Sequence, residues 1–325
     1  MKQRVFIYHG NCYDGFTAAW VFNRFFKPGL NDAPVEYVGA HYGDQPPDCK
    51  GKEVWLVDIS FDRETMIEKI IKPSTRTIIM DHHKTAEAAL AGILDEVRDK
   101  HRLSRKGDTV TFDMHRCGSG ILYDYLDGEA GKLAGFHKPR YNGGRELWLV
   151  DYIEDRDLWK KALPDTEEVH AYLASIPMTF GNWDAANAMG RMNVVEGGRS
   201  IKRYIDLYGV KARQQARFET FAGYRVPTLN IPYMNCSEYV NELLSEYPDA
   251  PFALSYFKAN DGTWRFSLRS KGEFDVSSIA TQYGGGGHRN AAGFSWATLP
   301  WLDQPIAAPV TDAVVPLVGG NGDPV

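Results

Sequence analysis

This chain of 325 residues is poor in cysteine, in long apolar runs and in excess positive charge. It has only four widely spaced cysteines and no Cys-x-x-Cys pair: Cys12, Cys49, Cys117 and Cys236. Such spacing argues against a disulfide framework and favours reduced thiols in a cytoplasmic protein. No run approaches about 18 uninterrupted apolar residues, and the apolar run near the N-terminus is too short for a signal peptide, so we expect a soluble protein without membrane contact. A net charge of −5 argues against a protein that coats nucleic acid over a broad basic surface.

The first half of the chain alternates short apolar, β-branched runs with helix-like segments. Strands are expected at 4–8, 35–39, 53–58 and 76–80, and helices at 16–26 and 62–71. This alternation predicts an α/β domain with a doubly wound parallel sheet. Residues 109–113 could form an edge strand, and 117–126 a helix after a glycine-rich loop. At that helix start we favour ordinary capping by Ser119 over an anion-binding site.

The second half predicts a helical connector and a smaller domain. Residues 165–225 look helical throughout, with Gly197-Gly198 before a long amphipathic stretch, and a second domain begins near Val226. Strand-like segments at 252–257 and 263–269 flank the turn Asn260-Asp-Gly, and a helix is expected at 276–283. We therefore expect a catalytic domain over 1–162, a connector over 163–225, a mixed-sheet α/β domain over 226–299 and an irregular tail over 300–325.

Candidate metal ligands follow several of the predicted strands. They are His9, Asp14, Asp58, Asp81, His82, His83 and one acid of the cluster Asp151, Asp155 and Asp157. Because the carboxyl ends of parallel strands share one edge of a sheet, the fold would gather these groups. Mixed carboxylate and imidazole donors suit Mn²⁺, Fe²⁺ or Co²⁺, with Mg²⁺ and Zn²⁺ as alternatives, and a pair of ions would need a bridging carboxylate. The alternative is a set of ordinary solvated side chains at strand ends.

A run of four glycines precedes a histidine and an arginine near the C-terminus. Consecutive glycines let a ligand approach the backbone and can expose N–H groups to an anion. The neighbouring cations could add phosphate contacts. The residues expected to bind substrate are Arg269, Gly284, Gly285, Gly286, Gly287, His288 and Arg289. A flexible turn with a solvated basic residue is the competing interpretation.

Together these motifs resemble the DHH phosphoesterase superfamily, in the branch with the DHH-associated C-terminal domain. The similarity covers roughly 4–160 and 226–298, and the motifs are His9…Asp14-Gly15, Val57-Asp58, Asp81-His82-His83 and the segment 284–293. The resemblance implies a two-domain phosphohydrolase with a metal centre, usually Mn²⁺, in the first domain. It also implies a second domain that holds the nucleotide or terminal phosphate of the substrate.

The resemblance also implies a role for each matching residue. His9 would bind one metal, Asp58 would bridge, and Asp14, His82 and Asp157 would bind the second metal. His83 would lie near the scissile phosphate, and Asp81 would orient a histidine. For the last acid, Asp155 and Asp151 rank behind Asp157. Cys12 stands where the family usually has an acid, and because a thiolate is a poor ligand for Mn²⁺, the number of metals is left open.

The function expected from these features is metal-dependent hydrolysis of phosphoester bonds in short oligonucleotides or small nucleotides by metal-activated water. A pyrophosphatase or polyphosphatase is the alternative within the enzymes, although the segment 284–293 argues against it. A nucleotide- or nucleic-acid-binding protein with weakened catalysis is the alternative from another class, and Cys12 is the residue that favours it. We expect no stable nucleic-acid complex, and a homodimer is compatible with the sequence.

Overall fold

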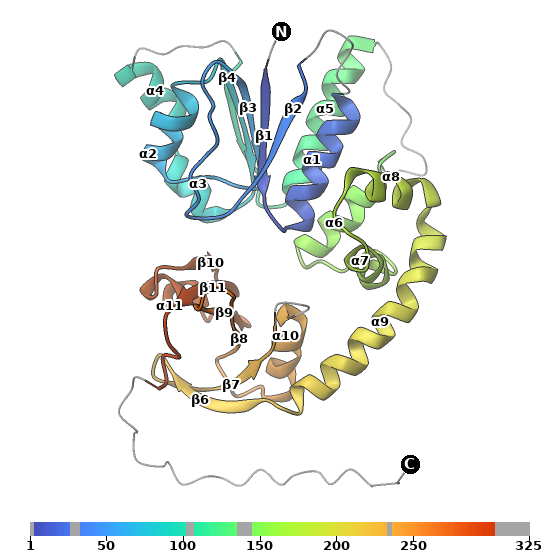
Figure 1. The fold of residues 1–325 in the computed structure, drawn as a ribbon, viewed down its shortest axis with the longest axis vertical. Coiled ribbons are helices and arrows are strands. Elements are labelled where there is room, and N and C mark those ends of the chain that lie inside the picture. Colours follow the sequence, from blue (N-terminus) through green and yellow to red (C-terminus); the bar gives the residue numbers. More distant parts are fainter. Residues whose placement is uncertain (1–2, 27–32, 102–106, 135–144, 233–235, 303–325) are drawn as a thin grey trace. The chain divides into compact units, whose positions relative to one another are not determined.

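The computed structural model describes residues 3–26, 33–101, 107–134, 145–232 and 236–302. They belong to two compact units, 1–210 and 211–325, which are described separately here (Figure 1). The predicted irregular tail lies outside the described residues from position 303 onward. Within the described part of the chain, no helix has the length and apolar character needed to cross a membrane.

The first unit is built on a five-stranded sheet in the order β2-β1-β3-β4-β5. Every neighbouring pair in it is parallel, which confirms the predicted parallel sheet and places β5 at its edge. The strands are β1 Arg4–His9, β2 Val35–Ala40, β3 Glu53–Val57, β4 Arg76–Asp81 and β5 Thr109–Phe112.

Helices cover both faces of this sheet, as the doubly wound prediction requires (Figure 1). On one face lie α1 Tyr13–Phe25 and α5 Gly118–Ala134; on the other lie α2 Arg63–Thr65, the π-helix η1 Met66–Ile71, α3 Lys84–Leu90 and α4 Ile93–His101. Side chains along each strand alternate between two cores: Phe6 and Trp55 pack with α1, whereas Val5 and Leu56 pack with η1. This alternation explains why the strands read as continuous apolar runs.

Four further helices follow: α6 Leu149–Asp157, α7 Thr166–Ala174, α8 Phe180–Met189 and α9 Arg191–Arg213. The first unit ends at Val210, within the last turn of α9. Gly197 and Gly198 lie inside α9, not before it. A Cβ atom at Gly198 would stand 1.9 Å from the carbonyl oxygen of Glu168. Glycine is therefore required there because α9 packs directly against the backbone of α7.

The prediction of helix up to residue 225 is wrong, since strand β6 spans Arg217–Phe221 and β7 spans Tyr224–Asn230. Ala222 and Gly223 join them with φ angles of 50° and 83°. Two successive left-handed residues are the mark of a tight hairpin turn whose twist matches the strands. This turn and the aromatic residues Phe218 and Phe221 outweigh the helical tendency of the preceding segment.

The second unit contains a six-stranded sheet in the order β10-β11-β9-β8-β7-β6. Only β7 and β8 are parallel, which confirms the expected mixed sheet. The remaining strands are β8 Phe252–Lys258, β9 Trp264–Ser270, β10 Gly286–His288 and β11 Ala291–Trp296. Helix α11 Val276–Gln282 agrees with the prediction, whereas α10 Cys236–Glu246 was not predicted. The core is aromatic, with Phe266 and Phe294 stacked 4.5 Å apart.

Candidate metal centre

The carboxyl edge of the parallel sheet gathers the candidate ligands. His9 is the last residue of β1, Asp58 follows β3, and Asp81 ends β4. The strand order 2-1-3-4-5 reverses between β1 and β3, and ligands of open α/β sheets bind at such a switch point. Asp58 adopts a left-handed backbone with φ of 63°, a conformation that costs about 1–3 kcal/mol and is concentrated at functional positions.

Three overlapping groups of side chains could each hold a metal ion. They are His9–Cys12–Asp58, Asp58–His82–His83 and Asp14–His82–Asp157, with the ligand atoms of each group within 4.8 Å of one another. Asp58 is shared by the first two groups and His82 by the last two. The Nε2 atom of His82 lies 3.0 Å from Asp58 Oδ1, 3.5 Å from Asp157 Oδ2 and 3.9 Å from Asp14 Oδ2. The structure thus brings together the side chains of all five predicted metal ligands.

Asp14 is fixed by the N-terminus of a helix that begins more than a hundred residues later. Its two carboxylate oxygens accept hydrogen bonds from the backbone N–H groups of Gly118 (2.7 Å) and Ser119 (2.9 Å). The acceptor that caps α5 is therefore Asp14, and the prediction of capping by Ser119 is corrected. A Cβ atom at Gly118 would lie 2.9 Å from Asp58 Cβ and 3.1 Å from Asp14 Oδ2. Sequence reasoning missed Gly118, although its position in a glycine-rich helix start was a usable signal.

Asp81 is fully buried and accepts four hydrogen bonds. They come from the Nδ1–H of His83 (2.7 Å), the backbone N–H groups of His82 (2.7 Å) and His83 (3.1 Å), and the hydroxyl of Ser60 (2.7 Å). Burial alone would raise the pKa of Asp81, but the hydrogen bond from His83 lowers it below its usual value. The carboxylate therefore orients the His83 ring through Nδ1.

The carboxylates of the cluster repel one another, and burial together with this repulsion raises the pKa values of two of them. Burial and the neighbouring Asp14 and Asp58 raise the pKa of Asp157 to about 7, and burial together with Asp58 raises the pKa of Asp14. Burial would lower the pKa of His82, but its hydrogen bond to Asp58 and the other two acids raise it to about 10. Burial would raise the pKa of Asp58 as well, but hydrogen bonds from His82 and His9 lower it. Asp14 and Asp157 keep raised pKa values, and a divalent cation would relieve the repulsion among the three carboxylates. Their oxygen atoms and the imidazole nitrogen form a donor set that fits Mn²⁺, Fe²⁺ or Co²⁺.

The two lower-ranked acids of α6 hold local structure. Asp155 is buried and accepts hydrogen bonds from two backbone N–H groups of the following loop and from the hydroxyl of Thr166 (2.5 Å). Asp151 forms an ion pair with Arg145 at 2.5 Å. Of the three candidates, only Asp157 has a carboxylate among the groups able to hold a metal.

The glycine run of the second unit is less available to an anion than predicted. The N–H groups of Gly284 and Gly285 donate to the carbonyls of Thr281 and Ala280 and close the end of α11. Gly286 and Gly287 lie in β10, which pairs with β11. A Cβ atom at Gly285 would lie 2.2 Å from the carbonyl oxygen of Gly293, so glycine is required there for strand packing.

The three basic residues predicted to bind substrate are Arg269 in β9, His288 at the end of β10, and Arg289 directly after it. His288 pairs with Ala291 and Ala291 pairs with Arg269, so His288 and Arg269 share one row of the sheet two strands apart. In-register residues point to the same face, and two strand spacings correspond to about 10 Å. Arg269 donates to the hydroxyl of Ser237 on α10. Arg289, by contrast, forms a surface ion pair with Glu273 at 2.5 Å.

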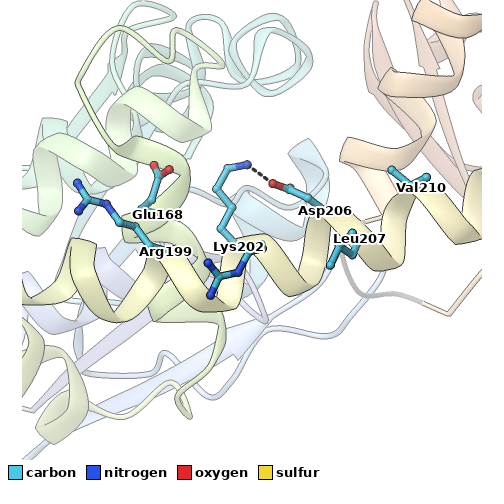
Figure 2. A pocket seen from close by; sticks show the side chains of 7 residues that line it. Glu168, Arg199, Lys202, Asp206, Leu207 and Val210 are labelled. Carbon is cyan, nitrogen blue, oxygen red and sulfur yellow. Dashed lines mark hydrogen bonds and ion pairs between the residues drawn. The ribbon is translucent and has the colours of Figure 1, made fainter. Parts of the chain in front are cut away.

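A separate hollow of about 360 Å³ lies between α7 and α9 in the first unit (Figure 2). Lys202 reaches along α9 to Asp206 at 2.6 Å, and Arg199 lies opposite Glu168. Charges of both signs line this hollow, so its electrostatics select neither an anion nor a cation.

The DHHA1 domain family matches residues 224–304. The second unit therefore carries a DHHA1 domain, which confirms the resemblance to the DHH superfamily in the branch that bears this domain. Protein R106 of Acanthamoeba polyphaga mimivirus, an uncharacterised protein, is 27% identical over 317 residues, covering 90% of this chain and 67% of that protein.

Two solved structures match this chain over most of its length. An exopolyphosphatase-related protein from Bacteroides fragilis is 13% identical with a TM-score of 0.46, covering 92% of this chain and 88% of that one. RecJ from Thermus thermophilus, solved with Mn²⁺, is 13% identical with a TM-score of 0.48, covering 90% of this chain and 49% of that one. At these values the likenesses carry no argument about activity.

Proposed function

We propose that this protein is a metal-dependent phosphohydrolase that cleaves phosphoester bonds of short oligonucleotides or small nucleotides. The observation that carries the proposal is the convergence of Asp14, Asp58, His82 and Asp157 at the carboxyl edge of the sheet. Carboxylates forced this close together are costly unless a cation neutralises them. Mn²⁺ is the ion that we propose first, because the donors combine hard oxygens with imidazole nitrogen.

When bound, the metal would lower the pKa of a water molecule and neutralise charge on the phosphoryl oxygens. The chain's own residues would do the rest. Asp58 would bridge two ions, and the N–H groups at the N-terminus of α5 would hold Asp14 in place as a ligand. His83, oriented by Asp81, would donate through Nε2 to a phosphate oxygen and stabilise the charge that develops there.

For substrate binding we propose the DHHA1 domain. Arg269 and His288 on one face of its sheet would contact the terminal phosphate of a short oligonucleotide or nucleotide. The internally bonded N–H groups of Gly284 and Gly285 make a backbone nest the weaker part of this proposal. We also propose that substrates bind transiently in the cytoplasm, without a stable nucleic-acid complex.

A nucleotide-binding protein with weakened catalysis is the second candidate, and the observation that favours it is the Cys12 thiol among the metal ligands. A binding protein would retain affinity for nucleotides but release no product. A pyrophosphatase is disfavoured because residues 224–304 match the DHHA1 domain, which agrees with a nucleotide-sized substrate.

The test is a hydrolysis panel with Mn²⁺ on the full-length protein, spanning dinucleotides, longer RNA and DNA, cyclic dinucleotides, 3′,5′-bisphosphorylated adenosine and pyrophosphate. The double variant His82→Ala/His83→Ala should lose hydrolysis of the preferred substrate. His115→Ala is the matched control, because His115 is exposed in the same unit and absent from the ligand groups. Turnover that survives in the double variant, or nucleotide binding without turnover in the wild type, would contradict the proposal.

A further inference from the structure

The thiol of Cys12 lies among metal ligands and takes no part in helix capping. Cys12 occupies the N-cap position of α1, where Ser, Thr, Asp and Asn are preferred because their side chains accept a hydrogen bond from the first turn. Its side chain makes no such bond. Instead Sγ donates to Asp58 Oδ2 at 3.3 Å, beside His9. The side chain therefore contributes to the cluster and not to the helix.

Two of the three distances between these donors are close to those of a tetrahedral zinc site. The Oδ2 atom of Asp58 lies 3.3 Å from Cys12 Sγ and 3.7 Å from His9 Nδ1. Zinc bonds of about 2.3 Å to sulfur and about 2.0–2.1 Å to nitrogen or oxygen place tetrahedral ligands roughly 3.3–3.6 Å apart. Three protein ligands around such an ion also leave a fourth position open, as in catalytic zinc sites.

The two ends of the cluster differ in the softness of their donors. His9, Cys12 and Asp58 offer nitrogen, sulfur and oxygen, whereas Asp14, His82 and Asp157 offer only oxygen and nitrogen. Thiolate favours Zn²⁺ and other borderline or soft ions and is a poor partner for Mn²⁺. We infer that the group His9–Cys12–Asp58 is a zinc-preferring subsite and that Mn²⁺ binds at the group Asp14–His82–Asp157. The inference rests on the metal centre of the proposed function. When the metal–sulfur bond forms, the thiol of Cys12 loses its proton to solvent.

The experiment uses metal-free full-length protein and Co²⁺ as the spectroscopic stand-in for Zn²⁺. Addition of Co²⁺ to the wild type should produce a thiolate-to-cobalt charge-transfer band in the near ultraviolet, and Zn²⁺ should abolish the band whereas Mn²⁺ should not. Cys12→Ser should lose the band and weaken Zn²⁺ binding by more than the roughly 10–100-fold that loss of an outer-sphere partner costs. Cys12→Asp should lose the band and gain a second Mn²⁺ in equilibrium dialysis with elemental analysis.

Cys236→Ser is the matched control, since Cys236 lies in the other unit, and it should keep the band. Absence of the band in the wild type would overturn the inference whether or not any variant folds. Persistence of the band in Cys12→Ser would overturn it as well. If the band is present but no substrate is hydrolysed, the proposed function fails and the zinc subsite stands. If Mn²⁺ alone supports hydrolysis and no band forms, the proposed function stands and the zinc subsite fails.

Discussion

Removal of the charge on Asp157 should stabilise the protein when no metal is bound. The carboxylate of Asp157 lies near Asp14 and Asp58, and burial together with these two acids raises its pKa from 3.8 to about 7. A raised carboxylate pKa means that the charged form destabilises the folded state. The substitution Asp157→Asn keeps the shape of the side chain and removes this charge.

The magnitude follows from the pKa and the exposure of the side chain. A rise from 3.8 to about 7 corresponds to about 4 kcal/mol for a dry carboxylate, at about 1.4 kcal/mol for each tenfold change in proton affinity. The Asp157 side chain is 26% exposed, so solvent screening reduces the expected gain to roughly 1–2 kcal/mol. The destabilisation is absent below about pH 3.8, grows between about pH 3.8 and about pH 7, and is complete above about pH 7.

The assay is urea unfolding in the presence of a chelator, followed by tryptophan fluorescence at several pH values. At about pH 8 the variant should be more stable than the wild type, and the difference should vanish toward about pH 4. Added Mn²⁺ should stabilise the wild type by mass action and the variant much less. Asp151→Asn, on the same helix but ion-paired with Arg145, should give no gain. A metal-free Asp157→Asn protein no more stable than wild type at about pH 8 would refute the reasoning.

Two pairs of glycine variants test close packing at the two candidate sites. Gly118→Ala should weaken Mn²⁺ binding and destabilise the first unit by about 1–3 kcal/mol, because its Cβ would stand 2.9 Å from Asp58 Cβ. Gly128→Ala in the same helix meets nothing within 4 Å and should stabilise by about 0.5–1 kcal/mol; equal metal titrations for the two variants would contradict the prediction. Gly285→Ala should destabilise the second unit by about 3 kcal/mol or more in calorimetry, since its Cβ would lie 2.2 Å from the Gly293 carbonyl. Gly286→Ala is the control, because a Cβ atom at Gly286 would meet no atom within 4 Å. Equal melting temperatures for the two variants would show that strand packing does not require glycine at position 285.

The parallel sheet and its ligand-bearing edge could be predicted from local patterns. Apolar strands of about five residues, each followed by an acid or a histidine, are enough to place His9, Asp58 and Asp81 at one edge, because parallel strands share their direction. The preference for Asp157 over its two neighbours came from motif resemblance, and the structure places its carboxylate beside His82.

The parts that could not be predicted depend on contacts between distant residues. The capping of α5 by Asp14 joins residues about a hundred positions apart, and no local pattern encodes it. The hairpin at Ala222-Gly223 was missed because the Arg- and Lys-rich segment before it favours a helix, whereas the strand needs a sheet partner to be stable. The glycine run was expected to expose its N–H groups, but the end of α11 uses those of Gly284 and Gly285.

The most direct test of the metal centre is the number of divalent ions bound by each full-length chain. Equilibrium dialysis with elemental analysis should find at least one tightly bound Mn²⁺ or Zn²⁺ per chain in the wild type. Asp58→Asn should lose bound metal, because Asp58 belongs to two of the three ligand groups, and Asp151→Asn should retain it. A wild-type chain that binds no divalent ion, or an Asp58→Asn chain that binds as many as the wild type, would contradict the assignment of this cluster as a metal centre.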